Sequence, residues 1–139
     1  MDRVFKRCLI TGIAGSGGSY LAEYILKKSP LTKIFGFRRS SGYSNYLKKK
    51  YKSKVLISKI DLNNFNDLKR KLKIVKPDVI FHLASNADVR NSFFKPLKFS
   101  ENNNMITVNL LEALRQIKSK AIIVICSTSE VYGNVKKKN

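Results

Sequence analysis

Tryptophan is absent from this chain of 139 residues, histidine occurs once, and there are only two cysteines and three prolines. A structural zinc site takes four Cys or His ligands, so this supply argues against one, and no metal site is predicted. Cys8 and Cys126 fall in separate expected strands, and no disulfide framework is implied. They are expected to be small core residues, and a reducing cytoplasm fits this cysteine usage.

Long apolar runs are also absent. No stretch approaches the ~18 residues needed to cross a bilayer. The basic start of the chain, residues 1–7, is not followed by an apolar stretch with small residues at a cleavage point. No membrane segment and no signal peptide are therefore predicted, and the expected location is the cytoplasm. The length allows one domain at most, and 43% hydrophobic residues is ordinary for a globular chain.

Acidic residues are scarce: nine Asp and Glu stand against 28 Lys and Arg, for a formal net charge of +19. A basic surface can indicate binding to nucleic acid or acidic lipid. Here the lysines are spread along the chain and cluster only at 48–50 and 136–138, with no aromatic pattern for stacking. Together with abundant Asn, they indicate a compositional bias at solvated positions, so no nucleic-acid partner is predicted. A functional basic patch is the alternative, and positive potential would also attract a dinucleotide or a nucleotide sugar.

Apolar runs alternate with segments of helical spacing, which predicts a parallel sheet covered on both faces. Strands are expected at 4–11, 33–37, 55–60, 78–84 and 121–126. Helices are expected at 20–26, 64–76 and 105–117, and a basic segment after the loop at 40–42 could form a further short helix. The predicted fold class is α/β, a Rossmann-type doubly wound parallel sheet with strand order 3-2-1-4-5. It forms one domain over 1–139 that is incomplete at its C-terminus.

Three glycines follow the first expected strand at regular spacing: Gly12, Gly15 and Gly18. Gly12 would allow a tight turn, Gly15 would let the backbone approach a pyrophosphate, and Gly18 would let the helix pack closely on the strand. The helix that starts here offers unpaired N–H groups and a partial positive charge to phosphates. Because strand, turn and helix occur in the required order, this segment, with Ser16 and Gly17, is predicted to bind a dinucleotide. A purely structural turn is the alternative.

The end of the second expected strand bears on the choice between NAD and NADP. A carboxylate about 20 residues beyond the glycines would hold the ribose 2′-hydroxyl of NAD. The chain has Arg38-Arg39 instead, and an arginine can form two hydrogen bonds with the 2′-phosphate of NADP. NADP is therefore favoured over NAD, with two arginines on a solvated loop as the alternative. Asp61, after the third strand, could accept a hydrogen bond from the adenine amine or cap the following helix.

These segments together resemble the extended short-chain dehydrogenase/reductase family and, within it, the GDP-mannose 4,6-dehydratases. The resemblance covers essentially the whole chain in order, at residues 11–23, 38–41, 61–62, 76–78, 83–84, 110–113 and 128–133. It implies an NADP-dependent enzyme that acts on a nucleotide sugar, with GDP-mannose as the favoured substrate, and that assembles as a homo-oligomer. It also implies that Leu62, Leu83, Ala84 and Ser85 contact the cofactor.

The resemblance further assigns catalytic roles to Thr128 and Glu130. Thr128 would hydrogen-bond the sugar 4-oxygen while hydride leaves C4 for the cofactor. Glu130 would then remove the C5 proton as general base, water would leave C6, and hydride would return to C6. GDP-mannose would become GDP-4-dehydro-6-deoxy-mannose. Ser129 stands where dehydratases acting on dTDP-glucose carry Asp, which favours the GDP-mannose branch.

Several alternatives stay open. The chain could belong to an epimerase or reductase of the same family, or be a non-enzymatic NADP-binding module. Thr128 and Glu130 could merely satisfy a turn at the end of a strand. The family's catalytic tyrosine lies in a Tyr-x-x-x-Lys motif on a later helix, and the look-alike at 132–136 is expected to form a turn instead. The chain is therefore expected to be the N-terminal part of an enzyme and inactive by itself.

The chain also departs from the family pattern. Ser16-Gly17 replaces Gln-Asp in the turn, Lys98 aligns with a cofactor-contacting tyrosine, and residues 85–87 replace Ala-Gln-Ser. These departures affect the exact set of cofactor contacts. His82, the only histidine, lies in an otherwise apolar strand and is expected to be buried and hydrogen-bonded rather than catalytic.

Overall fold

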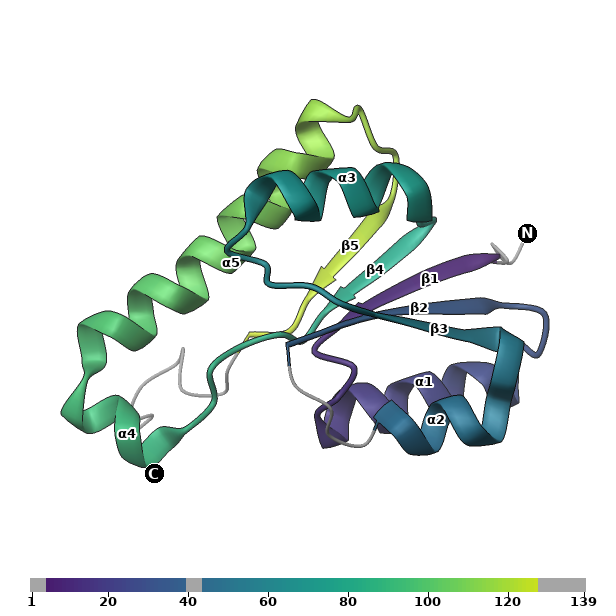
Figure 1. Cartoon of the computed structure of the whole chain (residues 1–139), viewed down its shortest axis with the longest axis horizontal. Coiled ribbons are helices and arrows are strands. Elements are labelled where there is room, and N and C mark those ends of the chain that lie inside the picture. Colours follow the sequence, from purple (N-terminus) through teal and green to yellow (C-terminus); the bar gives the residue numbers. More distant parts are fainter. Residues whose placement is uncertain (1–4, 40–43, 128–139) are drawn as a thin grey trace, which may run out of the picture.

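The computed structural model describes residues 5–39 and 44–127. Its centre is a parallel sheet of five strands in the order β3-β2-β1-β4-β5 (Figure 1). This confirms the predicted Rossmann-type fold and strand order. The strands are β1 (Arg7–Thr11), β2 (Lys33–Arg38), β3 (Val55–Lys59), β4 (Val79–His82) and β5 (Ile122–Ile125).

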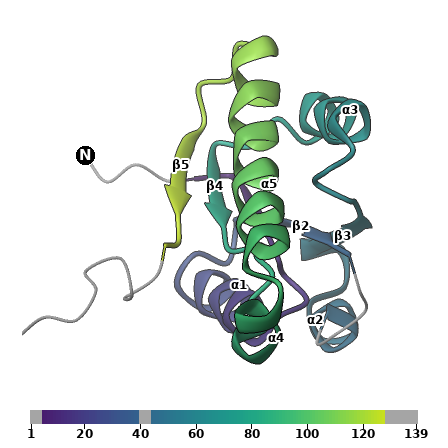
Figure 2. The same ribbon diagram turned by 90° about the vertical axis from the view of Figure 1, so that its left-hand side faces the viewer.

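Helices cover both faces of the sheet, as Figure 1 and Figure 2 show. One face carries α1 (Ser16–Lys28) and α2 (Ser44–Tyr51), and the short 3-10 helix η1 (Lys52–Lys54) follows α2. The other face carries α3 (Phe65–Val75) and α5 (Pro96–Gln116), with the short helix α4 (Val89–Phe94) just before α5.

Strand β1 shows how the sequence builds the two layers of core. Successive side chains of a strand point to opposite faces, so Cys8 and Ile10 pack in the core beneath α1, whereas Leu9 packs in the core beneath α3 and α5. Burial raises the pKa of the Cys8 thiol to about 12, so this residue is a protonated core residue, as predicted. The same prediction for Cys126 was wrong: it is exposed, because it follows β5 at the edge of the described sheet.

Helix α5 is longer than its apolar pattern predicts, because it begins at Pro96 rather than at 105. Its buried side chains all lie in the second half, from Ile106 to Leu114, and the first half projects beyond the sheet (Figure 1). A projecting helix needs no apolar stripe facing the sheet, so periodicity could not reveal it. The proline at its first position was the available signal. Helix α4 was not predicted.

Helix α3 agrees with its prediction to within one residue at each end. The side chain of Asn64 accepts a hydrogen bond from the backbone N of Asp67 at 3.1 Å and caps the start. Lys76 ends the helix in the left-handed conformation, with a φ of +44°, and Pro77 follows. The capping residues therefore place α3, and the loop before it, at a defined position on the sheet.

Candidate functional site

The carboxyl ends of β1 to β4 and the middle of α5, at Asn102 and Ile106, surround a cavity with a volume of about 410 Å³. The strand order reverses between β1 and β4, and ligands of open α/β sheets bind outside the carboxyl ends at such a point. Every residue predicted to contact the cofactor lines this cavity. These residues are Gly12, Gly15, Ser16, Gly17, Gly18, Arg38, Asp61, Leu62, Leu83, Ala84 and Ser85.

Two glycines, Gly12 in the turn after β1 and Gly18 in the first turn of α1, are required by the surrounding backbone. Gly12 has a φ of +73°, and a Cβ there would lie 2.9 Å from the Cα of Ala84. A Cβ on Gly18 would lie 2.5 Å from the carbonyl oxygen of Gly12. At Gly15 the nearest atom to an added Cβ would be 3.4 Å away, an ordinary contact. The described chain therefore leaves room for a methyl group at Gly15, on the wall of the cavity.

The start of α1 has no side-chain cap. A helix N-terminus carries unpaired N–H groups and a partial positive charge. In the described residues, α3 and α4 use the side chains of Asn64 and Asp88 as caps. Helix α1, whose N-cap is Gly15, has no side-chain cap and no acidic residue in its first turn, and the same is true of α5. Because this end of α1 lines the cavity, the arrangement suits an anion.

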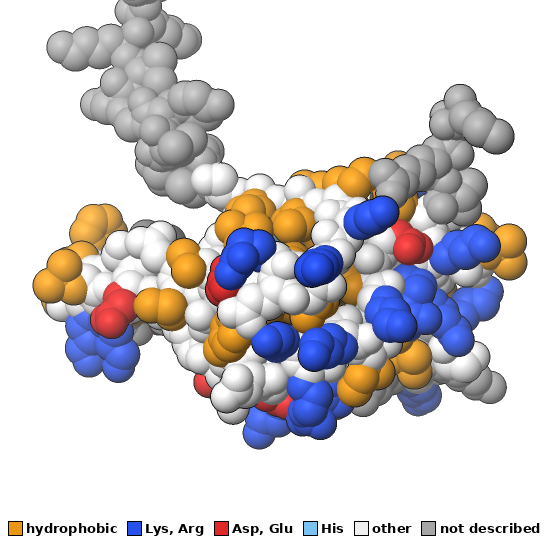
Figure 3. Space-filling view, turned by 90° about the horizontal axis from the view of Figure 1, so that it is seen from above, with side chains coloured by type: hydrophobic (Ala, Val, Ile, Leu, Met, Phe, Trp, Pro, Cys, Tyr) orange, Lys and Arg blue, Asp and Glu red, His pale blue; other side chains and the backbone are white. Residues whose placement is uncertain are grey.

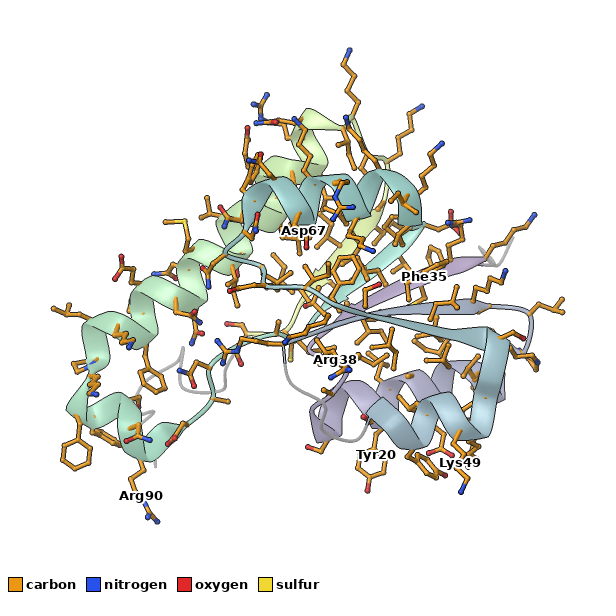
Figure 4. All side chains as sticks on the ribbon, viewed as in Figure 1. Tyr20, Phe35, Arg38, Lys49, Asp67 and Arg90 are labelled. Carbon is orange, nitrogen blue, oxygen red and sulfur yellow. The ribbon has the colours of Figure 1, made fainter. Side chains whose placement is uncertain are left out.

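Arg38 ends β2 and lines the same cavity. Figure 4 shows it at the carboxyl end of the strand, near the beginning of α1. Its Nε atom is buried, and no hydrogen-bond partner for it exists among residues 5–39 and 44–127. A buried donor without an acceptor costs free energy, so the site fits a bound anion that would supply one.

Asp61 shapes the loop after β3. Its Oδ1 accepts a hydrogen bond from the backbone N of Asn63 at 3.0 Å, and its carbonyl oxygen accepts one from the backbone N of Asn64 at 3.0 Å. The alternative that Asp61 caps α3 was wrong, because Asn64 is the N-cap residue. Asp61 is exposed where it lines the cavity, and its contact with adenine stays a prediction.

His82 is buried at the end of β4, as predicted. Its Nδ1 lies 2.7 Å from the Oγ1 of Thr11, and its Nε2 lies 3.1 Å from the Oγ1 of Thr107 in α5. Burial lowers the pKa of the imidazole, so the ring is neutral at neutral pH. The expectation of a buried, hydrogen-bonded histidine is confirmed.

Asparagines of α5 hold the loops around the cavity, a role that was not predicted from the sequence. The side chain of Asn103 accepts a hydrogen bond from the backbone N of Asn86 at 2.7 Å and donates one to its carbonyl oxygen at 3.2 Å. The side-chain amide of Asn109 donates to the carbonyl oxygen of Leu62 at 3.0 Å. The run of Asn at 102–104 was the available signal, and attributing it to composition was incomplete.

The predicted catalytic residues, Thr128 and Glu130, lie outside the described residues, as does the look-alike at 132–136. Strand β5 runs parallel to β4, with Ile125 beside His82, so the described chain reaches the edge that holds the cavity. Lys98 lies in the first turn of α5 and is not among the described residues that line the cavity.

Basic side chains are spread over the face of the molecule that Figure 3 shows. Figure 3, seen from above relative to Figure 1, shows Lys and Arg interspersed with acidic and apolar side chains. Glu23 pairs with Lys50 at 2.5 Å, and Glu112 pairs with Arg115 at 2.7 Å. Within the described ranges, no three His, Cys, Asp or Glu side chains are grouped to hold a metal ion. No helix in that part of the chain has the length and apolarity to span a membrane.

Residues 9–139 match the model of a protein family described as GDP-mannose 4,6 dehydratase. The chain belongs to this family. Membership of the GDP-mannose 4,6-dehydratase family also confirms the expected relation to the extended short-chain dehydrogenase/reductases. Within the wider group, the dTDP-D-glucose 4,6-dehydratase of Dictyostelium discoideum is 39% identical over 96% of this chain and 31% of its own length.

Two further relatives define the level of similarity. The GDP-mannose 4,6-dehydratase of Yersinia enterocolitica is 34% identical over 94% of this chain and 37% of its own length. The crystal structure of dTDP-glucose 4,6-dehydratase from Bacillus anthracis in complex with NAD gives a TM-score of 0.78 at 27% identity, over 96% of this chain and 41% of that one. The chain thus spans 31% of the length of the Dictyostelium relative and 37% of the length of the Yersinia relative.

Proposed function

We propose that the cavity binds NADP. When bound, the nicotinamide supplies a hydride acceptor and donor. The glycine turn and the open start of α1 hold the pyrophosphate, Arg38 holds the 2′-phosphate, and Asp61 accepts a hydrogen bond from the adenine amine. The observation that carries this proposal is the buried Nε of Arg38, which lacks a partner among the described residues and lines the cavity. Leu62, Leu83, Ala84 and Ser85 also line the cavity.

The preference for NADP over NAD rests on Arg38. The comparison with NAD is the relevant test, because the structure of the Bacillus anthracis relative is a complex with NAD. We expect the protein to bind NADPH more tightly than NADH in calorimetric titrations. Arg38→Ala should weaken NADPH binding about 10- to 100-fold, because charge-assisted hydrogen bonds are lost, and should change NADH binding little. Arg70→Ala removes the same charge from the surface of α3, where Arg70 pairs with Asp67, and serves as the control.

Two results would contradict the NADP assignment. The wild type could bind neither dinucleotide, or Arg38→Ala could weaken the binding of NADPH and of NADH equally. In the first case the cavity itself would have been misassigned. In the second case the dinucleotide site would stand, but Arg38 would not read the 2′-phosphate.

We further propose that the whole protein is a nucleotide-sugar 4,6-dehydratase acting on GDP-mannose. Family membership supports dehydration, and Ser129 supports GDP-mannose. In this proposal the Thr128 hydroxyl donates a hydrogen bond to the sugar 4-oxygen. The Glu130 carboxylate takes the proton from C5 and gives it to the C6 hydroxyl, which leaves as water. The two free cysteines, Cys8 and Cys126, support a cytoplasmic location within the same proposal.

The activity is tested with the whole protein, GDP-mannose and NADP. Mass spectrometry should show a product that has lost one water. Glu130→Gln should lower kcat by about 10²–10⁴-fold, which is the usual contribution of a general base, with little change in KM. Glu101→Gln removes an exposed carboxylate in α5 and is the control. A product of unchanged mass with one inverted carbon would instead identify an epimerase.

A further inference from the structure

A continuous path of hydrogen bonds runs from the glycine turn to helix α5. The backbone N of Ala84 donates to the Oγ1 of Thr11 at 3.2 Å, and this oxygen lies 2.7 Å from the Nδ1 of His82. The Nε2 of His82 lies 3.1 Å from the Oγ1 of Thr107. The Thr107 hydroxyl donates to the carbonyl oxygen of Asn103 at 3.1 Å.

The direction of these bonds follows from the groups at the two ends of the path. Because the Thr107 hydroxyl gives its proton to a carbonyl oxygen, its oxygen can only accept from His82, so Nε2 carries the ring proton. A neutral ring then has a bare Nδ1, which accepts from the Thr11 hydroxyl. The Thr11 oxygen in turn accepts from Ala84. Every donor in the path has one acceptor, so only one tautomer of His82 satisfies it.

The path joins two walls of the cavity. Thr11 directly precedes Gly12, and Ala84 lines the cavity after β4. At the other end, α5 holds the Asn86 backbone through Asn103 and the Leu62 backbone through Asn109. A displacement of α5 would therefore move three of the loops that surround the cavity. Neither His82 nor Thr107 is among the described residues lining it.

We propose that His82, in its Nε2–H tautomer, is a positioning residue for dinucleotide binding, because it fixes helix α5 against the glycine turn. The inference rests on the proposed dinucleotide site. It assigns to His82 no contact with the cofactor or substrate. Fully satisfied hydrogen-bond networks in the interior favour a single arrangement. In this path the bond between Thr11 and His82 is buried and the other three bonds are partly buried. That arrangement sets how the loop after β4 and helix α5 face the glycine turn.

Thr107→Val tests the link to α5 with a nearly isosteric change. We expect NADPH affinity, measured by calorimetry, to fall about tenfold, because the loops that line the cavity would no longer be held in position relative to α5. Thr107→Ser keeps the hydroxyl and should bind NADPH within about threefold of the wild type. Thr32→Val is the matched control, since buried Thr32 donates a similar hydrogen bond to the Phe5 carbonyl oxygen at 2.8 Å, before β2 and away from the cavity. It should lower the urea midpoint comparably and leave affinity unchanged.

The single histidine allows a direct second readout. Nitrogen-15 NMR of the imidazole should show Nε2–H in the wild type and a shift toward Nδ1–H in Thr107→Val, because Nε2 loses its acceptor. A charged or Nδ1–H ring in the wild type would overturn the proposal, and so would unchanged NADPH affinity in Thr107→Val. If the wild type bound no dinucleotide at all, the proposed function would fail together with the positioning role, whereas loss of the positioning role alone would leave wild-type binding intact.

Discussion

Gly18→Ala is expected to lower the free energy of unfolding by about 3 kcal/mol. The added Cβ would lie 2.5 Å from the carbonyl oxygen of Gly12 and 2.7 Å from the Cα of Ile13. Both are backbone atoms, so no change of rotamer relieves the contact, and α1 must move away from β1. The start of α1 lines the cavity, so dinucleotide binding should be lost as well. Urea unfolding followed by circular dichroism measures the first effect, and calorimetry the second.

Gly15→Ala should separate binding from folding at the same turn. Its Cβ would lie 3.4 Å from the nearest atom outside the adjacent residues, so the cost in stability should be about 1 kcal/mol or less, as for other alanines at a helix N-cap. The methyl group would stand where the backbone must approach a pyrophosphate. We therefore expect NADPH affinity to fall about 100-fold, or ~2.7 kcal/mol, in a protein that unfolds nearly as the wild type does.

Gly17→Ala completes the comparison as a control for stability. An added Cβ there would meet only the Cδ2 of Leu83, at 4.0 Å, and alanine is favoured over glycine inside a helix by about 0.8–1.0 kcal/mol. This variant should be at least as stable as the wild type. The account of the turn would be contradicted if Gly18→Ala were equally stable, or if Gly15→Ala bound NADPH with wild-type affinity.

The contrast between these glycines shows which parts of the site a sequence can reveal. The strand, the turn and the start of α1 are encoded in consecutive residues, so the steric need for glycine at Gly12 and Gly18 could be predicted from spacing and context. The role of Gly15 beside a pyrophosphate stays a prediction. The cap of α3 was harder, because Asp61 and Asn64 are both suitable cap residues three positions apart. Only the hydrogen bonds of the folded loop distinguish them.

The polar contacts of α5 could not be predicted from local patterns. Asn103 reaches Asn86 across 17 positions, and Asn109 reaches Leu62 across 47. A composition rich in Asn hides such contacts, because solvated and structural asparagines look alike in a sequence. The burial of Arg38 Nε is equally invisible beforehand, since it depends on how the strand end and the neighbouring loops pack.

Leu110→Ala tests whether the packing of α5 supports these contacts. Leu110 is fully buried in the core cluster that contains Leu9 and Ile80. Truncation to alanine removes apolar contacts and leaves a cavity, and should lower the free energy of unfolding by about 3 kcal/mol. Leu110 lies one position from Asn109, which holds the loop after β3, so we also expect faster amide exchange in that loop.

Leu111→Ala is the matched control on the same helix. Its side chain is 40% exposed, and the intrinsic helix preference changes in the same way at both positions. We expect a loss of about 1 kcal/mol or less, with amide exchange in the loop after β3 unchanged. Equal losses for the two variants would mean that α5 is not seated on the sheet as described, and the cavity would then lack the wall that Asn102 and Ile106 provide. We expect a large loss in the free energy of unfolding for Leu110→Ala alone. NADPH should restore part of that stability by binding to the folded state. This result would link the packing of α5 to the cavity that it lines.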